Sequence, residues 1–208
     1  MNNCHCQFGP RPFSPLLIVI SGPSGIGKDV VIQALRKHNP NTHFVITMTT
    51  RAPRAEEQDG VDYFFVKREE FEGLIAQGEL LEHAKVYSDY KGIPKAQVRQ
   101  ALLSGKDVIM RLDVQGAMTI RELCPEAVLI FLTATTREEW VNRLAARCSE
   151  SPEEFALRIG TAEAEYDKLD AFDYVVVNAD GKLDQTIETI QAIIMTEHQR
   201  VHPRQVTL

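Results

Sequence analysis

The feature that most constrains this chain is a glycine-rich loop that ends in a lysine. Two glycines five positions apart, Gly22 and Gly27, are followed directly by Lys28. This is the pattern of a phosphate-binding loop, in which backbone N–H groups surround phosphate oxygens and the lysine reaches the β- and γ-phosphates. The candidate phosphate-binding residues are Gly22, Pro23, Ser24, Gly25, Ile26, Gly27, Lys28 and Asp29.

The residues on either side of the loop support this interpretation. Residues 16–20 predict a short buried strand and residues 30–37 a helix. A phosphate would therefore lie at a helix N-terminus, where free N–H groups and the helix dipole favour an anion. The last residue of the pattern is usually Ser or Thr, whose hydroxyl binds Mg²⁺, whereas this chain has Asp29. The alternative is a strand-to-helix turn that binds no ligand.

Length and charge limit the possible partners. A chain of 208 residues is long enough for one substantial core and a small inserted lobe. The net charge of −6 argues against a surface that coats nucleic acid, and no apolar run approaches the roughly 20 residues of a membrane span. We therefore expect small-molecule substrates, no nucleic acid and no membrane as partners, and a monomer as the favoured state.

The N-terminal residues 1–15 contain three prolines and predict a flexible tail rather than a signal peptide. Cys4, His5 and Cys6 could hold a metal, but no second pair stands at the spacing of zinc ligands. Reduced thiols in a cytoplasmic protein are the simpler interpretation.

Four short apolar runs predict strands that are buried on both faces. They are residues 16–20, 108–112, 128–132 and 174–177. Because helical segments separate them, the expected fold class is α/β, with a parallel sheet of the P-loop NTPase type flanked by helices. The expected core comprises residues 16–43, 98–134 and 170–200, followed by a C-terminal tail at 201–208.

Two segments depart from this alternation. Residues 44–97 contain strand-like runs at 44–47 and 63–66 and a short helical run at 71–75, which predict an inserted small β-rich lobe. Residues 135–169 contain two capping boxes, at 136–139 and 151–154, which predict two helices.

These two helices carry three arginines, Arg143, Arg147 and Arg158, the first two of which lie four positions apart on one face. On spacing alone they could form a solvated face. Next to a phosphate loop they also suit a mobile helical lid for phosphoryl transfer.

A second group of residues suits the binding of an acceptor. Arg51 and Arg54 stand in a proline-containing loop, and guanidinium forks bind phosphate oxygens in pairs. Tyr63 adds a hydroxyl, and the carboxylate of Glu82 could accept from two adjacent N–H donors, which the edge of guanine offers and that of adenine does not. Each of these residues could instead be structural, in surface ion pairs, in the core or at a solvated strand end.

The chain resembles the guanylate kinase family from about residue 16 to residue 200. Besides the phosphate loop, the motifs that carry the resemblance are TTRAPR at 49–54, DGVDY at 59–63, LE at 81–82, DVQGA at 113–117 and VN at 177–178. The residues at 27–29, 90–94 and 111–113 are similar to those of the cyanobacterial and plant-organelle branch. The resemblance implies a Mg²⁺-dependent transfer of phosphate from ATP to GMP, with a GMP-binding lobe at 44–97 and a lid at 135–169.

The resemblance also implies roles for individual residues. The implied catalytic residues are Lys28, Arg51, Asp113, Arg143, Arg147 and Arg158. The implied GMP-binding residues are Thr47, Arg51, Arg54, Tyr63, Glu82, Lys91 and Asp113. Asn178 would lie beside the adenine of ATP, and Asp29 and Asp113 would lie near Mg²⁺.

Three departures from the commonest family pattern stand out. Asp29 replaces the hydroxyl that binds Mg²⁺, and Arg111 replaces an acid. Lys91 and Ile93 stand where a phosphate-binding Tyr and a guanine-binding Ser or Thr are usual. Because residues 111 and 113 point to the same side of their strand, beside the loop, we hypothesise that two charges have been exchanged. Asp29 would then face Arg111 or share Mg²⁺.

Two other functions are compatible with these residues. Ile93 would favour a kinase of the same fold that acts on another nucleoside monophosphate, because a donor to guanine is lost. Asp29 would favour a guanylate-kinase-like binding module with weak catalysis. Since Lys28 and both acceptor arginines are present, we expect phosphorylation of GMP to GDP.

Overall fold

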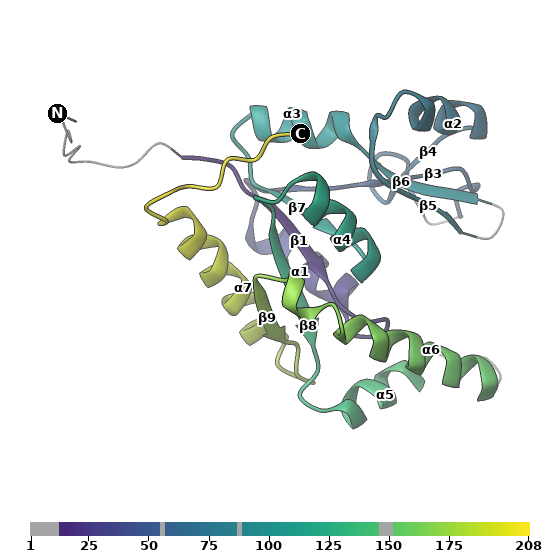
Figure 1. Cartoon of the computed structure of the whole chain (residues 1–208), viewed down its shortest axis with the longest axis vertical. Coiled ribbons are helices and arrows are strands. Elements are labelled where there is room, and N and C mark those ends of the chain that lie inside the picture. Colours follow the sequence, from purple (N-terminus) through teal and green to yellow (C-terminus); the bar gives the residue numbers. More distant parts are fainter. Residues whose placement is uncertain (1–12, 55–56, 87–88, 146–151) are drawn as a thin grey trace.

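Helices and strands follow the hydrophobic pattern of the chain in this computed structural model, which describes residues 13–54, 57–86, 89–145 and 152–208. A central sheet is covered by helices, and a second sheet and a pair of helices project from the same side of it (Figure 1). Within the described ranges, no helix is both long and apolar enough to cross a membrane.

The central sheet is entirely parallel, with the strand order β2-β7-β1-β8-β9. Its strands are β1 (Leu17–Ser21), β2 (His43–Phe44), β7 (Val108–Arg111), β8 (Val128–Thr133) and β9 (Tyr174–Val177). All four apolar runs of the sequence are therefore strands of one sheet, as predicted. Burial on both faces is wrong for β9, because it lies at the edge of the sheet with Val175 and Val177 about half exposed.

The two faces of this sheet are covered by different helices because side chains alternate along each strand. Ile18 and Ile20 of β1 pack with α1 (Lys28–His38) and α7 (Leu183–His198). Val19 packs on the other face with α3 (Lys95–Leu103) and α4 (Val114–Leu123). Burial of each such side chain contributes about 1.5–3 kcal/mol, so this double-sided core fixes the strand ends from which the site is built.

A second, mixed sheet has the order β4-β3-β6-β5. Its strands are β3 (Thr47–Thr49), β4 (Tyr63–Phe65), β5 (Leu80–Val86) and β6 (Asp89–Pro94). Helix α2 (Arg68–Ala76) packs Phe71 against Met48 and Leu80. The expected strand at 44–47 is wrong, because Phe44 pairs with β7 in the central sheet while Thr47 begins β3 of the second sheet.

Helices α5 (Arg137–Ala145) and α6 (Pro152–Tyr166) form the second projection and lead through the short 3₁₀ turn η1 (Leu169–Ala171) to β9. The hydroxyl of Thr136 accepts from the Glu139 N–H at 3.1 Å, and the Glu139 carboxylate accepts from the Thr135 N–H at 3.1 Å. This capping box starts α5, as the sequence predicts. The second predicted box includes Ser151, which lies outside the described residues.

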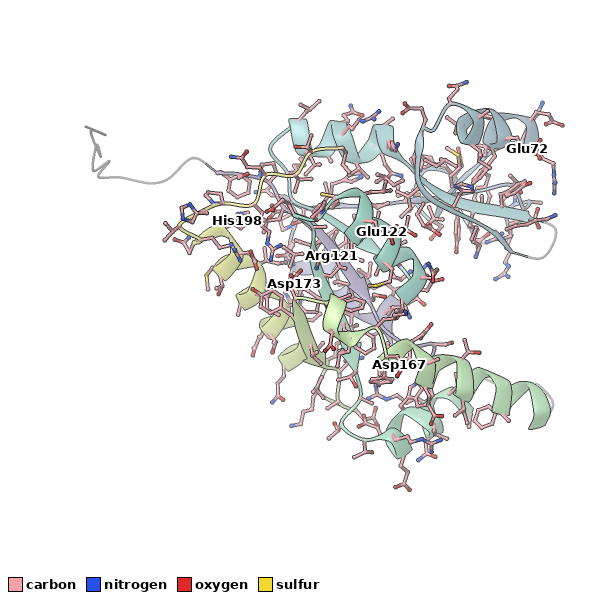
Figure 2. All side chains as sticks on the ribbon, viewed as in Figure 1. Glu72, Arg121, Glu122, Asp167, Asp173 and His198 are labelled. Atoms are coloured by element: carbon pink, nitrogen blue, oxygen red, sulfur yellow. The ribbon has the colours of Figure 1, made fainter. Side chains whose placement is uncertain are left out.

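The C-terminal residues pack back onto the core. Val206 and Leu208 contact the cluster that contains Val19. Arg204 pairs with the buried Glu197, which also accepts from the Tyr174 hydroxyl at 2.6 Å. Beside this group lies the ion pair of Arg121 and Asp173, at 2.7 Å (Figure 2).

At the other terminus, described contacts begin with Phe13, whose ring stacks on His198 with centroids 4.5 Å apart. Ser14 donates to the Arg204 carbonyl at 2.9 Å. The motif of Cys4, His5 and Cys6 lies outside the described residues, so its interpretation stays a prediction.

Candidate active site

The phosphate loop joins the end of β1 to the start of α1, and its glycines have positive φ angles. The values are 137° at Gly22, 81° at Gly25 and 96° at Gly27. A Cβ atom at Gly27 would lie 2.7 Å from the amide nitrogen of Asn178, and one at Gly22 would clash with the Leu132 carbonyl. Only glycine combines these angles with this space.

The loop is braced from two sides. The buried Asn178 donates from Nδ2 to the Ile26 carbonyl at 2.8 Å, and its Oδ1 accepts from the Thr186 hydroxyl at 3.1 Å. From α5, the indole of Trp140 donates to the Ser24 carbonyl at 2.8 Å. Asn178 therefore supports the loop, while its expected position beside adenine stays a prediction. Sequence reasoning missed Trp140, the single tryptophan of the chain.

Lys28 lies at the start of α1 with its ammonium folded over its own loop. The ammonium donates to the Gly22 carbonyl and, at 3.1 Å, to the Pro23 carbonyl. It lines a cavity of about 240 Å³, here called the acceptor pocket. Most of the predicted GMP-binding residues line the same cavity, namely Thr47, Tyr63, Glu82, Lys91 and Asp113.

The acceptor pocket contains two carboxylates with different environments. Burial, and to a lesser extent the charge of Asp113, raise the pKa of Glu82 to about 7. Asp113 accepts from the Gly116 N–H at 2.7 Å and so caps α4. Glu82 thus offers an acceptor that ionises near neutral pH, and Ile93 forms an apolar wall beside it.

The acceptor arginine Arg51 is held by a carboxylate. Its two terminal nitrogens donate to the two oxygens of Glu57 at 2.7 and 2.5 Å, and Arg51 lowers the pKa of Glu57 to about 2. The Arg51 guanidinium and the Lys91 ammonium lie 5.0 and 5.7 Å from the centre of the Tyr63 ring. Three of the predicted GMP-binding residues are therefore neighbours, and the guanidinium fork predicted to bind phosphate holds Glu57.

Arg54 is exposed, and its backbone N–H donates to the same Glu57 carboxylate at 2.9 Å. Sequence reasoning missed Glu57, although its place in a charged loop three residues after Arg54 is a weak signal. A contact of the Arg54 side chain with GMP stays a prediction.

Of the three expected lid arginines, the structure describes the contacts of one. Arg143 pairs with Glu139 and donates to the Asn178 carbonyl at 2.8 Å. It lines a cavity of about 380 Å³ together with Gly25 and Gly27. Arg147 and the side chain of Arg158 lie outside the described residues, so their roles stay predictions.

The two unusual charges of the sequence form an ion pair. Arg111 ends β7, Asp29 lies in the first turn of α1, and Arg111 Nη1 contacts Asp29 Oδ1. Burial lowers the pKa of the Arg111 guanidinium. Arg111 also lines the acceptor pocket and an adjacent cavity of about 210 Å³ that contains Asp29, here called the loop-side pocket. The first form of the exchange hypothesis, in which Asp29 faces Arg111, is therefore confirmed.

Comparison with known proteins shows the family to which this chain belongs. The family model described as "Guanylate kinase" matches residues 14–197. The chain belongs to the guanylate kinase family.

Individual family members match over most of the chain. "Guanylate kinase 2, chloroplastic/mitochondrial" of Oryza sativa subsp. japonica is 46% identical over 198 residues, covering 95% of this chain and 70% of the rice protein. The guanylate kinase of Halalkalibacterium halodurans is 44% identical over 183 residues, covering 88% of this chain and 89% of its own. The crystal structure of guanylate kinase from Anaplasma phagocytophilum matches with a TM-score of 0.69 at 30% identity, covering 90% of this chain and 88% of that one.

Membership of the guanylate kinase family establishes the activity, which is ATP-dependent phosphorylation of GMP to GDP. The predicted resemblance to a plant-organelle member is confirmed by the rice protein. Because these relatives are named guanylate kinases, they favour phosphorylation of GMP over the two alternatives, a kinase of another nucleoside monophosphate and a binding module with weak catalysis.

The residues of this guanylate kinase fit a magnesium ion that arrives on nucleotide phosphates. No group of three or more His, Cys, Asp or Glu residues that could hold a metal occurs in the described part of the chain. Mg²⁺ in kinases needs only one or two carboxylates, because phosphates and water supply its other ligands. Asp29, which directly follows Lys28 at the loop, has a carboxylate of this kind, and in the structure it pairs with Arg111.

Proposed function

We propose that GMP binds in the acceptor pocket with its base at Glu82 and its phosphate beside Tyr63 and Lys91, while ATP places its phosphates on the loop at Lys28. The observation that carries this assignment is that Lys28 and Glu82 line one cavity. The donor phosphates and the acceptor base would therefore share one space.

Phosphoryl transfer requires in-line positioning and neutralisation of negative charge more than covalent chemistry by the protein. Lys28 would leave the Gly22 and Pro23 carbonyls to neutralise charge on the transferred group. Arg51 and Lys91 would fix the acceptor phosphate, and the Thr47 hydroxyl and the Glu82 carboxylate would orient guanine. Bound Mg²⁺, with Asp29 as a protein ligand, would supply further neutralisation of the ATP phosphates.

The lid would act in the same step. Arg143 now rests on Glu139, so a contact with phosphate requires this pair to open. Closure would exclude water and so suppress hydrolysis of ATP.

Replacement of Glu82 tests the assignment of the acceptor pocket. Glu82→Ala is expected to lower kcat/KM for GMP by about a hundredfold or more, because guanine donors lose their acceptor. ATP affinity should stay unchanged, since Lys28 and the loop are intact. Steady-state kinetics and calorimetric titration with ATP measure the two effects.

Glu72→Ala is the matched control, since Glu72 is an exposed carboxylate on α2, away from the acceptor pocket (Figure 2). It should leave both values unchanged. GMP kinetics that are unaltered in Glu82→Ala would remove Glu82 from the pocket.

A further inference from the structure

We propose that Arg111 is a phosphate-positioning residue. Its ion pair with Asp29 would open when ATP binds, so that Arg111 contacts phosphate and Asp29 contacts Mg²⁺. This inference rests on the proposed function, since it takes the phosphate loop as the ATP site. It gives Arg111 a role in phosphate binding, which none of the predicted site roles includes.

Arg111 lies beside the phosphate loop and lines both pockets. Arg111 is paired in register with Ile20 of β1, so its backbone lies beside the start of the phosphate loop. Its side chain lines the acceptor pocket with Lys28 and the loop-side pocket with Asp29. A planar guanidinium thus stands where the donor and acceptor phosphates would meet, and such forks bind phosphate oxygens in pairs.

The environment of the Arg111 guanidinium favours an anionic partner. The Arg111 side chain is 38% exposed, and the removal of the rest of it from water favours an anionic partner. In the described structure that partner is the Asp29 carboxylate. The phosphates of ATP and GMP carry more negative charge than one carboxylate, so they compete well for Arg111.

Asp29 would need a cationic partner beside the ATP phosphates. Asp29 follows Lys28 directly, so its carboxylate would lie beside the ATP phosphates and repel them if it were left alone. A carboxylate is a good Mg²⁺ ligand, and the ion accompanies ATP. Both members of the pair therefore gain a better partner in one event, whereas either residue alone would be left with an uncompensated charge.

The test is a double-mutant cycle on ATP affinity, measured by calorimetry with Mg²⁺ and with EDTA. In EDTA, Arg111→Met should weaken ATP binding by about tenfold, because Asp29 is left uncompensated beside the triphosphate. Asp29→Asn alone should change it by no more than about twofold, because Arg111 already offsets the Asp29 charge in the native enzyme. The double variant should bind ATP nearly as the native enzyme does, and the gain in affinity from Mg²⁺ should shrink in both variants that lack Asp29.

Arg36→Met is the matched control. Arg36 lines the same loop-side pocket but stacks on Phe44 at 5.5 Å instead of pairing with Asp29. Its effect should simply add to that of Asp29→Asn. If the effects of Arg111→Met and Asp29→Asn also add, and the gain from Mg²⁺ is the same in all four proteins, the exchange is wrong.

Two further results distinguish failure of the exchange from failure of the proposed function. If Arg111→Met does not show cooperative thermal unfolding, Asp29→Asn decides alone, because an unchanged gain from Mg²⁺ in this variant overturns the exchange. A native enzyme that fails to phosphorylate GMP would overturn the proposed function. A native enzyme that phosphorylates GMP while the cycle is additive would overturn only the role of Arg111.

Discussion

At the scale of single residues, the charged groups of the site are held by partners that ligands would replace. Glu57 fills the fork of Arg51, two loop carbonyls hold Lys28, and Asp29 holds Arg111. These pairs pre-position the cations and limit their mutual repulsion. Under the proposed function, ligand phosphates would replace a carboxylate at Arg51 and at Arg111 and neutral carbonyls at Lys28, at a lower cost than ordering free side chains.

The ionisation of Glu82 predicts a pH dependence of GMP binding. Because burial and Asp113 raise the pKa of Glu82 to about 7, its carboxyl is mostly protonated at pH 6 and mostly ionised at pH 8. Only the ionised form accepts both guanine donors. Affinity should therefore rise by about tenfold from pH 6 to pH 8 and level off above it.

Calorimetric titration with guanosine isolates this effect, because guanosine lacks the phosphate group that also titrates near pH 6. In buffers of different ionisation enthalpy at pH 7, about half a proton should be released on binding. An affinity that is flat across this range, with no proton release, would contradict the assignment of Glu82.

At the scale of elements, hydrophobic patterns predict which segments form buried strands, but they do not predict where the chain passes from one sheet to another. Four of the five strands of the central sheet were predictable because each contains at least three consecutive apolar residues. The strand expected at 44–47 fails because the chain passes from one sheet to another within it. The hairpin of β5 and β6 was not predicted as a pair of strands, since charged residues such as Lys85 and Lys91 interrupt its pattern.

The geometry of the phosphate loop predicts opposite effects for two glycine substitutions. Gly27→Ala forces a side chain into a positive φ angle and against Asn178, so ATP affinity should fall by about tenfold or more and stability by about 1–3 kcal/mol.

The control is Gly73→Ala, which lies within α2 with open space around it. It should stabilise the protein by about 0.5–1 kcal/mol and leave ATP affinity unchanged. Calorimetric titration and thermal unfolding measure both values, and equal effects of the two substitutions would refute the account of the loop.

At the scale of the whole molecule, the site depends on contacts between distant parts of the chain. Asp29 meets Arg111, and Ile26 is braced by Asn178 across 152 positions. Local sequence patterns carry no information on such pairs. Motif order and family resemblance brought Asp29, Arg111 and Asn178 into one hypothesis. Glu57, which pairs with Arg51, and Trp140, which donates to the Ser24 carbonyl, emerged only from the fold.

The C-terminal residues predict a stability effect far from the site. Burial works against ionisation of Glu197, but hydrogen bonds from Arg204 and Tyr174 lower its pKa below the ordinary value. Arg204→Ala would leave this buried carboxylate without its main partner and should cost about 3–5 kcal/mol. The melting temperature should then fall by about 6–20 °C, while kcat at low temperature stays unchanged.

Arg137→Ala is the control, because Arg137 pairs with Glu163 at the surface, where both side chains are largely exposed. It should shift the melting temperature by no more than about 2 °C. Equal shifts for the two variants would show that burial of the Glu197 pair does not matter.

The central claim is that Glu82 recognises guanine in the acceptor pocket, where GMP receives phosphate from ATP bound at the loop. The most direct measurement is ADP release from ATP with GMP, AMP, UMP or CMP as the acceptor. The account predicts turnover with GMP at a kcat/KM about 10⁴-fold above that with AMP, because a buried acceptor rejects a base without matching donors. Comparable values for GMP and AMP, or no ADP release with GMP, would contradict it.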